Sequence, residues 1–223
     1  LVCAYKPNLA FYEALGLEGL EALYRTLKAM PPDVVVIGDA KRGDIGHTAK
    51  AYARSLFEGF GFDAATVNPY LGRDAVEPFL AYRDRGVFLL CKTSNPGSGD
   101  FQDLLCQTAE GNLPLYQVVA LRSRAWNSYG NVGLVVGATY PKQLAAVRQL
   151  APELPLLIPG VGAQAGDLQS TIQNGTDSIG ELAVVNSSRQ IIQASLGSDW
   201  QDAARKAAAA LRDEINLYRP TKG

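Results

Sequence analysis

Short apolar runs alternate along the chain with longer stretches in which apolar residues recur every three to four positions. A continuous apolar run between turn formers is typical of a strand buried on both faces, as in a parallel sheet. The longer stretches have the period of amphipathic helices. The runs predict strands at residues 1–5, 33–37, 64–67, 87–91, 132–136, 156–158 and 182–185.

This alternation predicts an α/β fold, and the strands number one fewer than a (β/α)8 TIM barrel needs. The chain opens on an apolar run without an initiating Met or a preceding turn. We therefore expect the first strand of the barrel to be missing from this chain and to lie upstream. The predicted organisation is a single (β/α)8-barrel domain at residues 1–218, followed by a tail or linker at 219–223.

Composition limits the class of protein. The 223 residues are 47% hydrophobic, and 21 basic against 22 acidic residues give a net charge of −1. This balance provides no electrostatic attraction for nucleic acid or for a membrane surface, and we expect neither as a partner. Three cysteines without C-x-x-C spacing, with a single histidine, indicate no zinc site and no disulfide framework. We expect a cytoplasmic protein with reduced thiols and no metal.

The densest cluster of charges follows the second expected strand, between Asp39 and Asp44. If the backbone is still extended there, Asp39 and Lys41 point the same way, because side chains alternate along a strand. Lys6 follows the first expected strand, so a barrel would bring it to the same mouth. The cluster is a candidate for proton chemistry: an ammonium can protonate a carbanion, and a fixed carboxylate can destabilise a substrate carboxylate. The alternative is a salt bridge at a strand end.

A second candidate site follows the strand at 156–158. Gly160 and Gly162 let backbone N–H groups converge on an anion, and Arg189, near the start of a later helix, adds a forked cationic donor. Barrels often bind phosphate with the loops after their last two strands, which is where these residues fall. We predict a phosphate site; the alternative is a tight turn and a surface arginine.

The segment Asp39-Ala40-Lys41-Arg42-Gly43-Asp44-Ile45-Gly46-His47-Thr48 resembles the D-x-K-R-x-D-I-x-x-T signature of the orotidine 5'-phosphate decarboxylase family. Residues 67–72, 92–98, 159–164 and 186–189 resemble further family segments in the same order, especially those of the bacterial branch with a Ser-Asn-Pro-Gly loop. The resemblance covers essentially the whole chain. It implies a barrel that decarboxylates orotidine 5'-phosphate to uridine 5'-phosphate, the last step of UMP synthesis, without a cofactor.

The resemblance also implies roles for single residues. Asp39 would crowd the substrate carboxylate, Lys41 would protonate C6 of the ring, and Lys6 would complete the alternating network. Asp44, Ile45 and Thr48 would reach into the site of a partner subunit, so the expected catalytic unit is a homodimer with shared active sites. The expected substrate-binding residues are Asn68, Ser94 at the pyrimidine, Pro159, Gln164 between pyrimidine and phosphate, and Gly160, Gly162 and Arg189 at the phosphate.

The resemblance leaves one family position unassigned, because the aspartate that contacts the ribose hydroxyls belongs to the missing first strand. Two alternatives stay open. One is a metal-dependent phosphosugar decarboxylase or aldolase of the same barrel superfamily, whose acids bind a divalent metal. The other is a non-catalytic nucleotide-binding fragment of a fusion protein. The tail at 220–223 would suit fusion to, or association with, orotate phosphoribosyltransferase.

Overall fold

The computed structural model describes residues 1–161 and 167–220. The chain forms two compact units. The N-terminal unit comprises Cys3–Leu90 and Ala125–Gly133, and the C-terminal unit comprises Leu1–Val2, Cys91–Arg124 and Leu134–Gly223. No helix among the described residues is long and apolar enough to span a bilayer.

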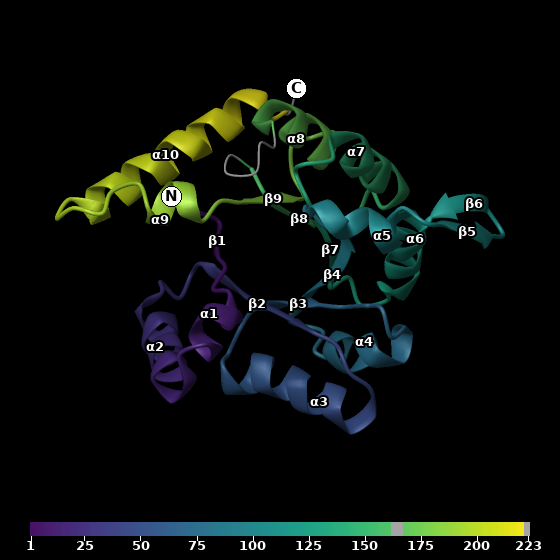
Figure 1. The fold of residues 1–223 in the computed structure, drawn as a ribbon, viewed down its shortest axis with the longest axis horizontal. Coiled ribbons are helices and arrows are strands. Elements are labelled where there is room, and N and C mark those ends of the chain that lie inside the picture. The colour runs from purple at the N-terminus through teal and green to yellow at the C-terminus, as the bar shows by residue number, and fades with distance from the viewer. Residues whose placement is uncertain (162–166, 221–223) are drawn as a thin grey trace. The chain divides into compact units, whose positions relative to one another are not determined.

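The N-terminal unit is built from parallel strands and the helices that follow them (Figure 1). β1 pairs with β2, β2 with β3, and β3 with the first part of β4. The strands are β1 (Ala4–Tyr5), β2 (Val35–Arg42), β3 (Ala64–Val67) and β4 (Gly86–Lys92). The helices are α1 (Leu9–Glu13), α2 (Gly16–Ala29), α3 (Gly46–Arg54), the π-helix η1 (Ser55–Gly59) and α4 (Arg73–Leu80).

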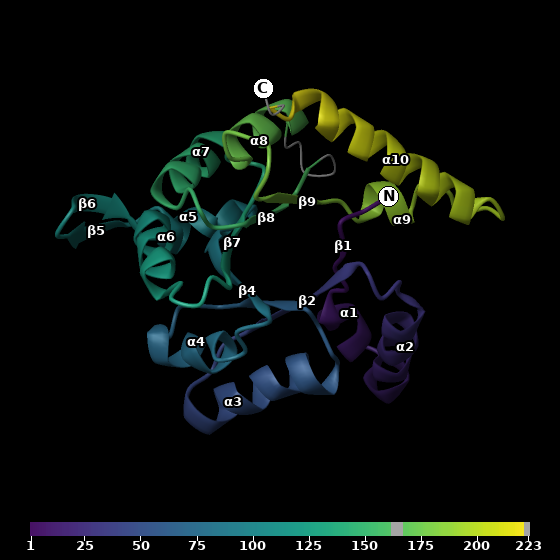
Figure 2. The ribbon, with the colours of Figure 1, turned by 180° about the vertical axis from the view of Figure 1, so that it is seen from behind.

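Helices α3 and α4 lie on the same side of β2 and β3 in both ribbon views (Figures 1 and 2). The apolar stripe of the segment after β2 faces inward, with Ala49, Ala53 and Leu56 fully buried. Phe57 of η1 packs edge-to-face on Phe79 of α4, with ring centroids 6.4 Å apart. These contacts hold the helices against the strands that carry the charged cluster.

The C-terminal unit continues the parallel pattern: β7 pairs with β8, and β8 with β9. Its strands are β7 (Val132–Val136), β8 (Leu156–Pro159), β9 (Ala183–Asn186) and the antiparallel hairpin β5 (Leu105–Thr108) and β6 (Gly111–Pro114). The helices are η2 (Pro96–Ser98), α5 (Gly99–Gln102), α6 (Leu115–Trp126), α7 (Pro141–Leu150), α8 (Leu168–Gly175), α9 (Arg189–Ile192) and α10 (Trp200–Tyr218). The last two residues of β4 and most of β7 belong to this unit.

The structure contains each predicted strand but differs from the prediction in the bounds of the first two strands and in one additional hairpin. The first strand is only Ala4–Tyr5, while β2 runs on to Arg42 and so includes Asp39 and Lys41. The hairpin β5–β6 was not predicted, because its residues form no continuous apolar run and half of them are exposed.

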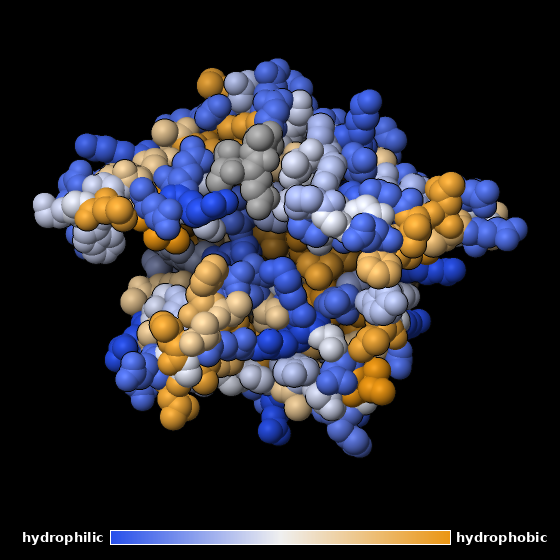
Figure 3. All heavy atoms as spheres, viewed as in Figure 1, coloured by the Kyte–Doolittle hydropathy of each residue, from blue (hydrophilic) through white to orange (hydrophobic). Residues whose placement is uncertain are grey.

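Exposed apolar side chains gather over α1 and α2. Phe11 is 76% exposed, Leu15 68% and Leu17 80%, and Figure 3 shows apolar residues over these helices. A cluster of this kind is typical of a protein interaction surface.

Candidate active site

Asp39 is the centre of the charged cluster in the N-terminal unit. It lies in the second half of β2 and is only 7% exposed. Lys6 Nζ lies 2.5 Å from Asp39 Oδ2, and Lys41 Nζ lies 2.6 Å from Asp39 Oδ1. Each oxygen of the carboxylate therefore has its own ammonium partner. The structure brings together the three residues that the sequence analysis placed at one mouth.

Two neutral side chains complete the environment of Asp39. The Thr66 hydroxyl donates to Asp39 Oδ1 at 2.9 Å and accepts from the backbone N–H of Lys41 at 3.0 Å. The Asn8 amide donates to Asp39 Oδ2 at 3.3 Å. The sequence analysis missed both residues. For Thr66 one signal was present, since it is the only polar residue of the buried strand β3.

Lys41 reaches Asp39 through an irregular backbone. Its φ is +48°, in the left-handed region that a residue with a side chain seldom adopts. The register of β2 on β3 shifts between Gly38 and Arg42. An extended backbone at both Asp39 and Lys41 was the premise of the sequence argument, and for Lys41 that premise is wrong. The two side chains still meet, and backbone strain of this kind is concentrated at functional sites.

The lysines keep Asp39 ionised. Burial by itself would raise the pKa of this carboxyl group. The charge of Lys6 and the hydrogen bonds from Lys41 and Lys6 act in the opposite direction, and the net pKa lies below the ordinary value of 3.8. Asp39 is therefore a fixed negative charge at neutral pH.

The other predicted residues of the N-terminal unit lie outside this cluster. Within the described residues, no hydrogen bond or ion pair joins Asp44 to Lys6, Asp39 or Lys41; its carboxylate accepts from the N–H of Ile45 at 2.8 Å. Ile45 is 58% exposed, and Thr48, on α3, is exposed too. Asn68 is exposed after β3, where its side chain accepts from the N–H of Tyr70 at 3.0 Å.

The C-terminal unit holds the predicted phosphate residues, of which some are described. Pro159 ends β8, and Gly160 follows with φ +97°, a conformation that favours glycine. Gly162 and Gln164 lie outside the described residues. Arg189 is the first residue of α9 and is exposed, and no ion pair of its side chain is seen in the described part of the chain. Ser94 is half-buried in the loop after β4.

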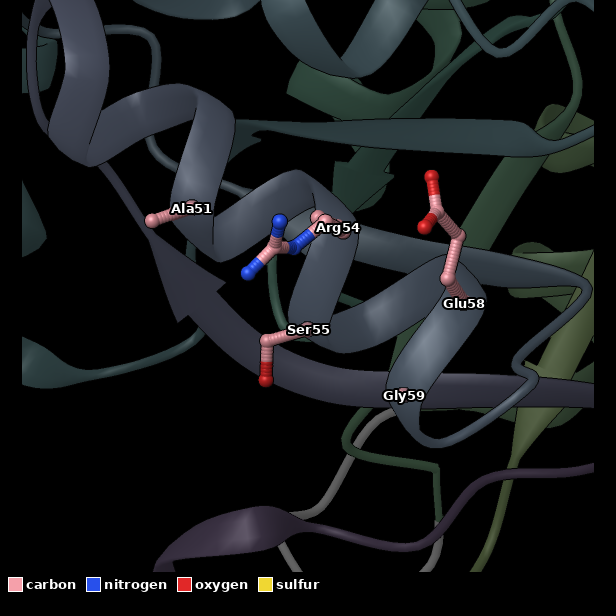
Figure 4. A pocket seen from close by; sticks show the side chains of 5 residues that line it. All are labelled: Ala51, Arg54, Ser55, Glu58 and Gly59. Atoms are coloured by element: carbon pink, nitrogen blue, oxygen red, sulfur yellow. The ribbon is translucent and has the colours of Figure 1, made fainter.

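Among the described residues, neither the surface pocket of the N-terminal unit nor a metal-binding cluster adds to the predicted site. A surface pocket of about 380 Å³ in the N-terminal unit is lined by Ala51, Arg54, Ser55, Glu58 and Gly59 (Figure 4). None of the predicted site residues lines it. Across residues 1–161 and 167–220, no three His, Cys, Asp or Glu side chains are grouped so that they could hold a metal ion.

Comparisons with known proteins agree on one family. The sequence model of the orotidine 5'-phosphate decarboxylase / HUMPS family matches residues 1–207. A protein of Dehalococcoides mccartyi named orotidine 5'-phosphate decarboxylase is 53% identical over 218 residues, which are 98% of this chain and 81% of the relative.

Solved structures give the same result for the fold. The Leishmania donovani OMP decarboxylase structure superposes with a TM-score of 0.86 at 45% identity, over 97% of this chain and 81% of the other. The Leishmania donovani UMP synthase structure gives a TM-score of 0.89 at 46% identity and covers 99% of this chain. This chain spans 47% of that UMP synthase chain.

These matches confirm three predictions made from the sequence: the family resemblance, the α/β fold of the (β/α)8-barrel class and the assignment to the decarboxylases. The match extends over nearly the whole chain, and so over both units. The chain belongs to the orotidine 5'-phosphate decarboxylase / HUMPS family.

Proposed function

We propose that this protein converts orotidine 5'-phosphate to uridine 5'-phosphate without a metal or organic cofactor, with Asp39 destabilising the substrate carboxylate and Lys41 protonating C6. The observation that carries the proposal is the 2.6 Å contact between Lys41 Nζ and Asp39 Oδ1. It places a proton donor directly beside a fixed negative charge. The reaction is inferred from the names of the relatives, and the mechanism is inferred from this contact.

The chemistry requires a pair of electrons to remain on carbon when carbon dioxide leaves. A substrate carboxylate bound beside the ionised Asp39 experiences charge repulsion, which is lost when the group departs as neutral carbon dioxide. The C6–carboxylate bond breaks, and its electron pair stays on C6. The Lys41 ammonium then transfers a proton to C6 to form the new C–H bond, and Lys41 regains a proton from water.

Lys6 acts on Asp39 in this scheme. Its ammonium holds the second carboxylate oxygen at 2.5 Å, while Thr66 and Asn8 fix the orientation of the carboxylate. A rigid charge costs no reorganisation when the substrate reacts, which is the condition under which electrostatic effects on rate are largest.

Substrate binding is assigned to the loops after the strands. The family resemblance assigns Ser94 to the pyrimidine, Gln164 to the pyrimidine and phosphate, and Asn68 and Pro159 to substrate binding. Arg189 binds the phosphate with the backbone at Gly160 and Gly162. The exposed guanidinium of Arg189 and the left-handed Gly160 support this part of the proposal. Phosphate binding far from C6 then contributes to catalysis by ordering the site.

The catalytic unit is proposed to be a homodimer in which Asp44, Ile45 and Thr48 enter the partner's site. The exposure of Ile45 and Thr48, and the absence of Asp44 from the described Lys6–Asp39–Lys41 cluster, support this assignment. The similarity to a UMP synthase is consistent with fusion to, or association with, orotate phosphoribosyltransferase. The cytoplasmic location and the single domain at 1–218 with a tail at 219–223 stay predictions.

The test follows the fall in ultraviolet absorbance as orotidine 5'-phosphate is consumed. Protein that has been incubated with excess EDTA and desalted should turn over as fast as untreated protein, because the scheme needs only side chains. Loss of turnover on chelation and its recovery with Mg²⁺ or Zn²⁺ would favour the metal-dependent alternative. Binding of UMP without turnover by untreated protein would favour the non-catalytic fragment.

A further inference from the structure

Lys92, the last residue of β4, is the most deeply buried cation of the described chain, with 0% exposure. Its Nζ donates to both carboxylate oxygens of Asp103 at 2.8 Å and to the Ser98 hydroxyl at 3.1 Å. It also lies 4.8 Å from the centroid of the Tyr140 ring. All these groups belong to the C-terminal unit. Breaking such a contact would leave a buried charge without its partner, which is costly.

These contacts restrain the loop that carries Ser94. Ser98 is in η2 and Asp103 follows α5, so one ammonium holds two points of the segment that begins immediately after Lys92. Two hydrogen bonds to Gln102 also restrain the first residue of the loop, Thr93. The N–H of Thr93 donates to Gln102 Oε1 at 2.9 Å, and Gln102 Nε2 donates to Thr93 Oγ1 at 2.8 Å.

Gly137 restrains Ser94 from a second direction. A Cβ added at Gly137 would lie 2.8–2.9 Å from the Cβ, Cα and N of Ser94, closer than side-chain carbons approach other atoms. The N–H of Gly137 also donates to the carbonyl of Lys92 at 2.7 Å. Ser94 therefore packs directly against the backbone of Gly137, and the space between them is too small for a side chain at residue 137.

We propose that Lys92 and Gly137 are positioning residues that set the location of Ser94 and thereby the recognition of the pyrimidine ring. The inference rests on the proposed function, in which Ser94 contacts that ring. Lys92 acts from β4 through Ser98 and Asp103, and Gly137 acts from the end of β7 by direct contact with Ser94.

The test compares two ligands, UMP and ribose 5-phosphate, which share the phosphate and differ by the pyrimidine. Dissociation constants are measured by calorimetry for the wild type and for Ser94→Ala, Lys92→Met, Asp103→Asn and Gly137→Ala. Each variant should bind UMP about fivefold or more weakly, the loss expected for one hydrogen bond. Binding of ribose 5-phosphate should change less than about twofold. Asp103→Asn keeps the size of the side chain and removes only the charge that pairs with Lys92, so it serves if Lys92→Met folds poorly.

Arg148→Met is the matched control for lost stability. Arg148 is the other buried basic side chain among the described residues of the C-terminal unit, and it donates to backbone carbonyls, among them Gly175 and Leu182. Its loss should lower the melting temperature and leave the ratio of the two dissociation constants unchanged. Combining Ser94→Ala with Lys92→Met should weaken UMP no further than Ser94→Ala alone.

The outcomes separate the two levels of the proposal. If Ser94→Ala weakens UMP while Lys92→Met, Asp103→Asn and Gly137→Ala do not, the positioning role is refuted and the proposed function stands. If Ser94→Ala leaves UMP binding unchanged, the role of Ser94 in the proposed function is wrong. If the variants weaken both ligands equally, as a general loss of structure would, Lys92 and Gly137 have only a structural role.

Discussion

At the scale of single residues, the account depends on the charge state of Asp39. A carboxylate this deeply buried would ordinarily bind a proton more readily than in water. Here two ammonium groups, at 2.5 and 2.6 Å, reverse that tendency and keep the group ionised. The proposed proton donor, Lys41, and the proposed destabilising charge, Asp39, are therefore parts of one ion-paired unit.

The lowered pKa of Asp39 has a consequence for stability. A carboxyl group with a lower pKa in the folded than in the unfolded chain stabilises the fold at pH values above its unfolded pKa, here near the ordinary value of 3.8. That contribution is lost as the pH falls through the lower folded value. Asp39 therefore stabilises the fold at neutral pH, and its contribution disappears only in strong acid.

Lys6→Met should move this acid limit upward. The charge of Lys6 is the largest of the effects that lower the pKa of Asp39, so its removal lets the pKa rise. The acid limb of kcat/KM, and the pH at which acid unfolding begins, should both shift to higher pH. Arg73→Met, which breaks an exposed ion pair with Glu77 on α4, is the control and should shift neither. An unchanged acid limb in Lys6→Met would show that Lys6 does not control Asp39.

The charged residues of this site were predictable from the sequence, and their neutral partners were not. Lys6, Asp39 and Lys41 stand out because charges follow apolar runs that form strands. Thr66 and Asn8 are small polar residues whose role comes from the side chain they meet across the sheet. The positive φ of Lys41 follows from the register shift between β2 and β3, which a pattern along one strand does not contain.

At the scale of elements, β2 packs closely on the ring of Phe62 at the residue next to Asp39 in the strand. A Cβ at Gly38 would lie 2.6 Å from the ring of Phe62, which is fully buried. Gly38 therefore lets the strand approach the ring one residue before Asp39. Irregular register begins directly after this contact.

Gly38→Ala should destabilise the fold by about 1–3 kcal/mol, the usual cost of overpacking a core. The measurement is the free energy of unfolding in urea. Gly59→Ala is the matched control: it lies in η1, and the nearest atom to its added Cβ is the carbonyl of Arg54 at 3.9 Å. That change should be neutral or stabilise by up to about 1 kcal/mol. Equal effects of the two substitutions would mean that the contact with Phe62 does not matter.

Most of the elements were predictable, for a physical reason. Parallel strands buried on both faces are apolar along most of their length, so β3, β4, β7 and β8 appear directly as apolar runs. The hairpin β5–β6 buries little and carries no such run. The π-helical turn η1 continues the stripe of α3 without a change that a 3.6-residue period could reveal.

At the scale of the whole molecule, the proposed homodimer divides the residues from Asp39 to Asp44 between the active sites of two subunits. In that proposal Asp39 and Lys41 would serve their own site, and Asp44 would serve the partner's. The exposed Ile45 and Thr48, next to Asp44 in the chain, would be covered by such a partner.

Mixed dimers test this division. Lys41→Ala and Asp44→Ala should each have very low activity alone, because every site lacks one residue. Co-expression of the two variants should restore about a quarter of wild-type activity, since half of random dimers are mixed and each has one intact site of two. The measurement is the turnover of orotidine 5'-phosphate per total protein in the co-expressed pool, with the share of mixed dimers checked by two different tags. No recovery would place Asp44 in the same subunit's site or outside the site.

The central claim is that Lys41 donates the proton to C6, and the most direct measurement is the turnover of Lys41→Ala together with its affinity for UMP. In Lys41→Ala, consumption of orotidine 5'-phosphate should fall to the background rate while UMP binding remains measurable, because loss of the donor leaves the phosphate and pyrimidine contacts in place. Turnover of Lys41→Ala at the wild-type rate would contradict the account.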